Sequence, residues 1–327
     1  MPNFKGPRTA IIGGAGYIGQ VMAQKLLSEN LEVRVVDSFL HGSQDLSLLQ
    51  KYPGFSFVQG DLKDHDQMSE ILSGYEAIIL LASLVGEKAC DKDPEETLIV
   101  NYLSPLTLLK ILLKQAYPIR FLFASTDSCY GNRPGEILDE LSPLKPESLY
   151  AFYKAELEKA LLFTPKKSLV SPIILRLGTV YGLAPRTRFD LAVNFITRDA
   201  TLKKTARIFS GEQWRPLVHV QDVASAFSLA LQAPLDMVSH QIFNVGTNSQ
   251  NIKFSALREL IQGICHEEIQ LLPGDPDLRD YYVDFTKIQK ILGFQAEISL
   301  AFGITELYEA LLTQKIADPY HPKYLNT

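Results

Sequence analysis

The chain has 327 residues, of which 46% are hydrophobic and 21% are charged, and its formal net charge is −5. This length predicts two lobes, or one large α/β unit with an appendage, and the composition excludes a disordered or low-complexity chain. A mildly acidic protein has no electrostatic reason to coat nucleic acid or an anionic membrane surface, and no apolar run approaches the roughly 18 residues of a membrane span. Three scattered cysteines and no secretory signal favour a reducing cytoplasm.

The first half of the chain alternates short apolar strands with helices. The expected strands are 8–13, 32–37, 55–59, 77–81, 119–124 and 170–175, and the expected helices are 17–30, 67–72, 93–114 and 148–162. This alternation requires right-handed crossovers and a parallel sheet. Continuous apolar strands indicate that helices cover both faces of that sheet.

The pattern changes after about Gly182. Here we expect helices at 190–200, 220–231, 253–263, 284–292 and 299–312, and strands at 206–209 and 241–245. The strand at 241–245 can return to the main sheet. The second lobe is therefore expected to be discontinuous.

The first strand ends in the sequence Gly13-Gly14-Ala15-Gly16-Tyr17-Ile18-Gly19, which opens the first helix. Glycine allows a tight turn and lets a pyrophosphate approach the backbone amides at the helix N-terminus. Asp37 ends the second strand, where its carboxylate can accept hydrogen bonds from both ribose hydroxyls. The same carboxylate would repel a 2′-phosphate, so the pattern favours NAD over NADP.

A second motif is Tyr150-Ala151-Phe152-Tyr153-Lys154. On a helix, Tyr150 and Lys154 share one face because they are four residues apart. An ordinary tyrosine is a poor base at neutral pH, but a nearby ammonium and a cationic nicotinamide favour its phenolate. The same spacing also fits a surface aromatic ring packed over a lysine stem. Its place after the strand 119–124, at the end of the sheet where α/β proteins bind ligands, supports the catalytic interpretation.

Taken together, the motifs resemble the extended short-chain dehydrogenases/reductases, and most closely their nucleotide-sugar epimerases and dehydratases. The matching positions, in chain order, are Gly13–Gly19, Asp37, Asp61-Leu62, Leu81-Ala82-Ser83, Asn101, Ser125-Thr126, Tyr130-Gly131, Tyr150-x-x-x-Lys154, Arg176–Gly182 and Arg215–Ala224. The resemblance covers nearly the whole chain.

It implies an α/β fold with a Rossmann-type, doubly wound parallel sheet and a smaller, mostly C-terminal α/β substrate lobe. The implied NAD-binding Rossmann domain spans 1–182, with 216–250 returning to it, and the substrate-binding lobe spans 183–215 and 251–327. It further implies tightly held NAD, a nucleoside diphosphate sugar as substrate, and a homodimer formed through the helices at 93–114 and 148–162.

The resemblance also implies roles for single residues. Tyr150 would be the acid/base, Lys154 would hold the nicotinamide ribose and tune Tyr150, and Thr126 would hydrogen-bond the reacting hydroxyl. Residues expected to bind the cofactor are Gly13, Gly16, Tyr17, Ile18, Gly19, Asp37, Asp61, Leu62, Leu81, Ala82, Ser83, Leu84, Asn101, Tyr150 and Lys154, with Asn101 helping to position Lys154. Residues expected to bind the substrate are Thr126, Thr179, Asn194, Arg215 and Arg279, the last three at its diphosphate. Arg186 and Arg188, just before Asn194, fit either that task or a solvated rim.

Two departures from the family pattern bear on the reaction. The 4,6-dehydratases use Thr-Asp-Glu where this chain has Thr126-Asp127-Ser128, so the carboxylate that removes the C5 proton is missing. Asp127 can protonate a leaving hydroxyl, or it can simply bond to backbone amides. Thr179 stands where galactose-type epimerases carry an asparagine that contacts the substrate, which leaves the sugar open.

The prediction is an NAD-dependent nucleotide-sugar epimerase that works through a transient keto sugar, with C4 as the expected carbon. A 4,6-dehydratase or ketoreductase of the same family is one alternative, and a non-catalytic dinucleotide-sensing protein is another. No metal is expected, because the six histidines show no metal-ligand spacing.

Overall fold

The computed structural model describes residues 4–42, 44–208, 211–266, 268–271 and 279–326. Its centre is a seven-stranded sheet in the order β11-β7-β5-β4-β1-β2-β3, in which all neighbours are parallel. The strands are β1 (Thr9–Ile12), β2 (Val33–Asp37), β3 (Phe55–Gln59), β4 (Ala77–Leu80), β5 (Ile119–Thr126), β7 (Val170–Leu177) and β11 (Gln241–Val245). The predicted Rossmann-type fold is confirmed. The strand order reverses between β1 and β4, which is where such sheets open a crevice for ligands.

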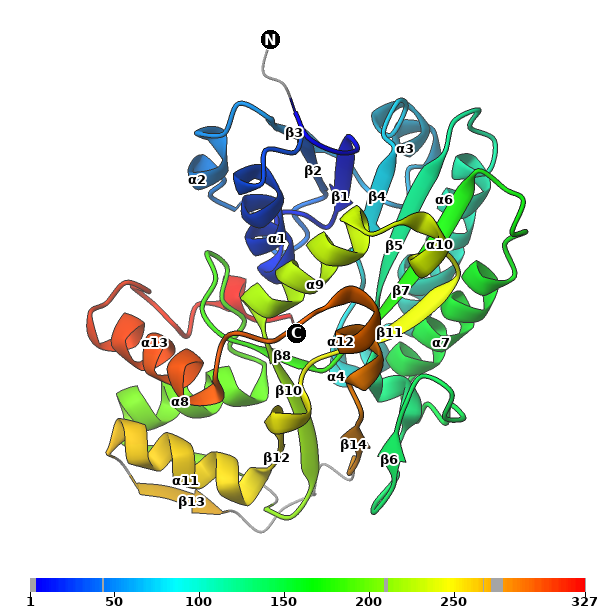
Figure 1. Cartoon of the computed structure of the whole chain (residues 1–327). Helices are drawn as coiled ribbons and strands as arrows, with labels where there is room; N and C mark the ends of the chain where they lie inside the picture. Colours follow the sequence, from blue (N-terminus) through cyan, green and yellow to red (C-terminus); the bar gives the residue numbers. More distant parts are fainter. Residues whose placement is uncertain (1–3, 43, 209–210, 267, 272–278, 327) are drawn as a thin grey trace.

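Helices cover both faces of this sheet (Figure 1). On one face lie α1 (Tyr17–Ser28), α2 (Ser47–Gln50) and α9 (Val220–Gln232), and on the other lie α3 (His65–Ile71), α6 (Ser104–Leu112) and α7 (Leu149–Leu162). Side chains alternate across a strand. Accordingly, Ile11 is buried with Leu26 of α1 and Phe227 of α9, whereas its neighbour Ile12 is buried with Leu157 of α7. The near-continuous apolar strands are thus explained by burial on both sides.

Among the described residues, three small sheets lie outside the seven-stranded sheet, and sequence periodicity indicated only one of their strands, at 206–209. They pair β12 (Asn251–Lys253), β10 (Trp214–His219) and β8 (Thr179–Tyr181) in one sheet, β13 (Glu268–Leu271) with β9 (Thr205–Ile208), and β14 (Tyr282–Val283) with β6 (Ile137–Leu138). The helices α8 (Ala192–Lys203), α11 (Phe254–Cys265) and α13 (Leu300–Leu312) bury a common apolar cluster that includes Ile196, Ile261 and Ile304. Phe209, expected in the strand 206–209, lies outside the described residues.

The two lobes exchange segments. β11 joins the main sheet beside β7, and α12 (Thr286–Leu292) and α10 (Leu235–Val238) lie near that edge (Figure 1). β10, by contrast, pairs with β8 and β12 in the second lobe. The predicted domain boundaries at 182, 215 and 250 stay a prediction.

The helix expected at 93–114 is helical throughout but is built in three parts. It consists of α5 (Pro94–Leu98), a π-helical turn η1 (Ile99–Leu103) and α6, and it is preceded by α4 (Glu87–Lys92). Asp93 caps α5 by accepting a hydrogen bond from the Glu96 amide at 3.0 Å. π-helical turns recur at functional sites, and this one carries Asn101, whose side chain is buried.

Three 3₁₀ turns complete the regular structure: η2 (Asp127–Tyr130), η3 (Asn248–Gln250) and η4 (Pro322–Tyr324). Across the described ranges, we find no helix with the length and apolar character that crossing a bilayer requires.

Candidate active site

Two glycines at the turn between β1 and α1, Gly13 and Gly19, have no room for a side chain. Gly13 has φ +84°, and a Cβ there would lie 2.6 Å from the Ala82 nitrogen. A Cβ on Gly19 would lie 2.5 Å from the Gly13 carbonyl oxygen. These positions require glycine for the reason the sequence indicated, since the backbone after β4 and the first turn of α1 both close onto the turn.

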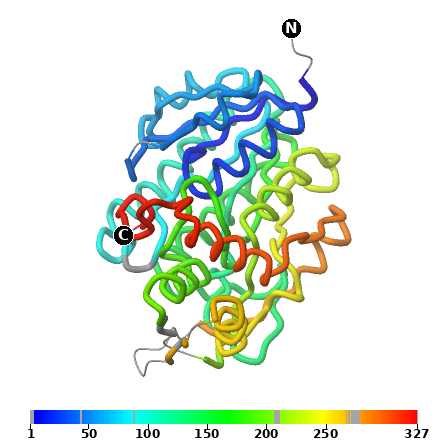
Figure 2. The backbone as a smooth tube through the Cα atoms, turned by 90° about the vertical axis from the view of Figure 1, so that its left-hand side faces the viewer, coloured from blue at the N-terminus to red at the C-terminus, as the bar shows by residue number. Residues whose placement is uncertain are grey.

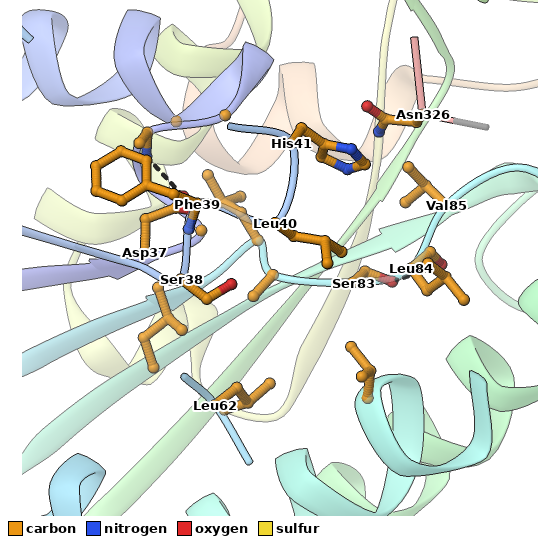
Figure 3. Close-up of a pocket in the computed structure, with 18 of the residues that line it drawn as sticks. Asp37, Ser38, Phe39, Leu40, His41, Leu62, Ser83, Leu84, Val85 and Asn326 are labelled. Atoms are coloured by element: carbon orange, nitrogen blue, oxygen red, sulfur yellow. Dashed lines mark hydrogen bonds between the residues drawn. The ribbon is translucent and has the colours of Figure 1, made fainter. Parts of the chain in front are cut away.

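Asp37 is placed at the end of β2, facing this turn. Its Oδ2 accepts from the Ala15 amide at 2.9 Å and its Oδ1 accepts from the Phe39 amide at 2.9 Å (Figure 3). Burial raises the pKa of this carboxyl, and those two amides oppose the rise. Each carboxylate oxygen keeps a second lone pair, which leaves acceptors for ribose hydroxyls.

A pocket opens beside Asp37 at the carboxyl ends of the central strands (Figure 3). Its lining includes every residue predicted for the cofactor except Asn101, Tyr150 and Lys154. It also includes residues that the sequence did not indicate for this pocket: Phe39, Leu40, His41, Lys63, Val85, Arg186, Arg188 and Asn326. Leu40 and Phe39 give it an apolar side, while Arg186 and Arg188 bring positive charge from the second lobe.

The pocket fits a dinucleotide. Gly16 forms the N-cap of α1 and, among the described residues, no side chain caps that helix end. Its first-turn amides therefore have no intrahelical acceptors and point their donors at the pocket, as anion sites at helix N-termini do. Together with the acceptors of Asp37, this donor set matches a pyrophosphate and a ribose diol.

Asn101 holds the strand-end loop that lines this pocket. Its Oδ1 accepts from the Ser83 hydroxyl at 2.9 Å and the Leu84 amide at 2.8 Å, and its Nδ2 donates to the Leu84 carbonyl at 2.8 Å. The side chain is thus committed to the cofactor loop. Within the described residues these side-chain hydrogen bonds do not include Lys154, and the predicted positioning of Lys154 by Asn101 through backbone and water contacts stays a prediction.

Tyr150 and Lys154 lie on one face of α7, as their spacing predicts. Ser148 caps this helix by accepting from the Ala151 amide at 3.3 Å. The Lys154 ammonium is buried, donates to the Ala124 carbonyl at 2.9 Å and lies 5.7 Å from the centre of the Tyr150 ring. Lys154 thus connects the helix that carries Tyr150 with the end of β5.

Burial sets the titration of both groups. It raises the pKa of the Tyr150 hydroxyl above its ordinary value, and Arg188 opposes that rise. Burial also lowers the pKa of Lys154 to about 8. The protein alone therefore holds Tyr150 as a neutral phenol, and a phenolate requires a further positive charge in the site.

Thr126 and Asp127 end β5 next to this helix. The Thr126 hydroxyl accepts from the Ser128 amide at 3.1 Å. Asp127 is buried, and its Oδ1 accepts from the Tyr281 hydroxyl at 3.2 Å, while its Oδ2 has no hydrogen-bond partner among the described atoms. Burial raises the pKa of Asp127 to about 7, although Arg215, Tyr281 and Arg279 oppose that rise. The backbone amide of Ser128 also lowers this pKa, so both predicted roles of Asp127, acid and backbone acceptor, stay predictions.

Of the second-lobe residues predicted to bind the diphosphate, Arg215 and Arg279 lie near Asp127, whereas Asn194 is engaged elsewhere. Arg215 is buried, its guanidinium lies 5.3 Å from the Tyr281 ring centre and it donates to the Arg279 carbonyl. Asn194 instead accepts from the Gly182 amide at 2.9 Å and donates to the Arg188 carbonyl at 2.9 Å, which fixes the loop before α8. Thr179 is half-buried at the start of β8.

With this geometry in place, comparison with known proteins identifies the family. Residues 9–246 match the NAD dependent epimerase/dehydratase family. The chain belongs to this family. The predicted recognition is therefore confirmed, and the protein is an NAD-dependent epimerase/dehydratase family enzyme that uses NAD.

Relatives of this family enzyme differ in the reaction they catalyse. The chain is 28% identical over 323 residues to UDP-glucose 4-epimerase of Mycolicibacterium smegmatis, covering 92% of this chain and 97% of that protein. It is 24% identical over 315 residues to dTDP-glucose 4,6-dehydratase of Streptomyces niveus, covering 92% of each. The crystal structure of UDP-glucose 4-epimerase from Thermotoga maritima with UDP-glucose superimposes with a TM-score of 0.83 at 26% identity, covering 94% of this chain and 99% of that one.

Beyond the other pocket-lining residues named above, sequence reasoning did not indicate Tyr281, Asn326 or Glu158. Glu158 accepts from the Ser125 hydroxyl and pairs with Arg176. Tyr281 had no local signal, because it is distant in sequence from Asp127 and the two meet only through the fold. A weak sequence signal existed for Glu158, since it follows Lys154 by one helical turn on the same face. Asn326, at the rim of the pocket, had none.

Proposed function

We propose that this family enzyme epimerises a nucleoside diphosphate sugar at C4 through a transient keto sugar. The observation that carries the proposal is a hydrogen bond. Lys154, on the helix that also carries Tyr150, donates to the carbonyl of Ala124, two residues before Thr126. It supports a single site in which a phenol, an ammonium and a hydroxyl act on one sugar hydroxyl. The 4-epimerase of M. smegmatis and the UDP-glucose complex from T. maritima support the substrate class.

In this mechanism Tyr150 accepts the proton of the sugar hydroxyl while Thr126 hydrogen-bonds the same oxygen. When bound, NAD supplies a reversible hydride acceptor and, in its oxidised form, the positive charge that favours the Tyr150 phenolate. Lys154 stabilises that phenolate, and Arg215 and Arg279 hold the diphosphate while the keto sugar presents its other face. Tyr150 then returns the proton to the oxygen of the inverted carbon.

A second candidate, sugar 4,6-dehydration, is favoured by Asp127. A carboxyl with a pKa of about 7 and an unengaged oxygen can protonate a leaving hydroxyl. Elimination also needs a base for the C5 proton, and the next residue is Ser128, whose hydroxyl is not one. This missing base is why epimerisation ranks first.

The test is incubation of the native enzyme with UDP-, GDP-, CDP- and dTDP-sugars followed by NMR. Epimerisation predicts a mixture of two C4 epimers with no net change in NADH absorbance. The Tyr150→Phe variant should lose turnover and keep its NAD. A 4-keto-6-deoxy product would establish the dehydratase, and net NAD(P)H consumption would establish a ketoreductase. An NAD-loaded protein inert on the whole panel would indicate a sensing role.

We also propose a homodimer. Apolar side chains on and just after the η1–α6 segment and on α7 are exposed, with Leu103, Leu113 and Phe152 between 40% and 45% exposed. Beside them, the rings of Tyr102 and Tyr153 stack with centres 6.1 Å apart. Exposed apolar surface that spans neighbouring helices is typical of an interface, and a second copy can cover it by matching the same two helices.

A further inference from the structure

Arg186 is a second-lobe residue that reaches the dinucleotide pocket. It lies in the loop between β8 and α8, yet it lines that pocket together with Arg188 and Asp37. Only 3% of its surface is exposed. A guanidinium buried this deeply in a cofactor pocket needs a partner that stabilises its positive charge.

No carboxylate within the described ranges forms an ion pair with Arg186. Its Nη2 donates to two neutral acceptors, the Asn326 side-chain oxygen at 2.6 Å and the Leu325 carbonyl at 3.3 Å, and its buried Nε has no partner among the described atoms. Arg188 is paired with Asp190, with Nη2 and Oδ2 2.5 Å apart. Burial lowers the pKa of Arg186 and the nearby charge of Arg188 lowers it further, while the carboxylates of Asp190 and Asp37 act in the opposite direction without pairing with it.

Burial of the Arg186 guanidinium lowers the free energy of unfolding unless an anion binds beside it. A buried charge that lacks a counter-ion destabilises the folded state, and a guanidinium fork suits phosphate oxygens. His41, which also lines the pocket, cannot serve as a counter-ion, because an imidazole is either neutral or positively charged. Burial and these two arginines lower its pKa to about 4, so it is neutral at physiological pH. The uncapped amides at the start of α1 favour an anion in the same pocket.

The same guanidinium holds residues 322–326, here called the closing segment. Its Tyr324 carbonyl accepts from the Phe189 amide at 2.9 Å, and the Phe189 and Tyr324 rings pack edge to face with centres 5.9 Å apart. Its Asn326 carbonyl lies 4.0 Å from the Cβ position of Gly86, in the loop after β4. Figure 2 shows this end of the chain beside that loop, and Figure 3 shows Asn326 at the same rim as His41 and Val85.

The closing segment therefore runs from Phe189 to the rim of the pocket, where Asn326 lines it beside the loop after β4. We propose that Arg186 is the counter-ion for the pyrophosphate of NAD, and that through Asn326 it holds the closing segment at the rim of the pocket. NAD then leaves only when the segment moves. By linkage, bound NAD stabilises the segment as much as the segment stabilises bound NAD. The proposal rests on NAD binding, which family membership establishes, and not on which sugar reaction occurs.

The first test measures exchange of bound NAD in the holoenzyme against excess deuterated NAD, followed by mass spectrometry. Arg186→Gln should accelerate exchange by about tenfold or more, because removal of a buried charge partner acts mainly on dissociation. Arg186→Lys keeps the charge, so its rate of NAD exchange should fall between those of the parent and Arg186→Gln. Lys323→Ala, on the same segment but outside the pocket lining, should exchange like the parent. Circular dichroism and a melting curve establish that each variant is folded.

The second test measures amide hydrogen exchange over residues 316–326 with and without saturating NAD. NAD should slow this exchange in the parent and in Lys323→Ala, and should slow it much less in Arg186→Gln. The proposal is overturned if folded Arg186→Gln releases NAD within twofold of the parent rate. It is equally overturned if NAD leaves the exchange of the closing segment unchanged in the parent. A parent that binds NADP as tightly as NAD would move Arg186 from the pyrophosphate to a 2′-phosphate.

Discussion

Arg176 and Glu158 form a fully buried, bidentate ion pair next to the proposed catalytic residues. The Arg176 Nη2 lies 2.6 Å and its Nε 3.0 Å from the two Glu158 oxygens, and both side chains are about 97% buried. Ser125, which directly precedes Thr126, also donates a hydrogen bond from its hydroxyl to Glu158. Since Glu158 follows Lys154 by one turn, the ion pair fastens the Tyr150 helix to β7, and the Ser125 hydrogen bond fastens it to the end of β5 that carries Thr126.

Glu158→Gln should therefore both destabilise the protein and slow the reaction. Loss of the charge leaves Arg176 buried without its counter-ion, which costs about 3–5 kcal/mol in comparable cases. Urea unfolding measures this loss, and steady-state rates should show a lower kcat with little change in KM. Glu156→Gln breaks an exposed pair with Lys159 on the same helix and should cost less than about 1 kcal/mol. Equal effects of the two variants would contradict a positioning role for Glu158.

The sequence could predict the Rossmann half because each step there is local. A glycine turn, an acid at a strand end and a four-residue spacing on a helix are set by short-range geometry, and Gly13, Asp37 and Tyr150 lie where those patterns indicate. The second lobe could not be derived in this way. Some of its strands, such as β8 and β14, have only two or three residues, too few to show a period, and they are stabilised by partners far away in sequence.

The same distinction explains the site. Arg186 was visible in the sequence as a basic loop residue, but whether it faced a diphosphate, the solvent or the cofactor depended on the packing of two lobes. Tyr281 meets Asp127 only because β14 pairs with β6. Neither relation has a signature within a single segment.

Asn101→Ala should weaken NAD binding without disturbing catalytic groups directly. The substitution removes three hydrogen bonds to Ser83 and Leu84, and an unsatisfied buried group costs about 1–3 kcal/mol, or roughly tenfold in affinity. Calorimetric titration of NAD into stripped protein measures the change. Thr107→Ala, farther along the same helical segment, should bind NAD like the parent. An unchanged Kd for Asn101→Ala would show that the loop after β4 holds its shape without this side chain.

Lys154 should make stability rise with pH. Its pKa is lowered from 10.5 to about 8 by burial, so between these values the unfolded chain binds a proton that the folded protein does not. The free energy of unfolding should therefore increase through this window, by up to about 1.4 kcal/mol per pH unit from this group. Urea titrations of NAD-free protein at pH 7.5, 8.5 and 9.5 test it against Lys154→Met. The difference between parent and variant should shift in favour of the parent as pH rises, and a constant difference would show that Lys154 does not titrate in this range.

Phe152→Lys should dissociate the proposed homodimer. Phe152 is 44% exposed on α7 and its ring packs edge to face against Tyr153, with centres 5.3 Å apart. A lysine at the centre of a two-fold interface faces its own copy, so one substitution introduces two like charges into an apolar contact. Light scattering after size exclusion should give a dimer of about 73 kDa for the parent, twice the 36.6 kDa chain, and a monomer for the variant. Leu141→Lys changes a 92% exposed side chain away from this surface and should leave the mass unchanged. A monomeric parent would contradict the homodimer. A Phe152→Lys variant that stays dimeric would place the interface elsewhere.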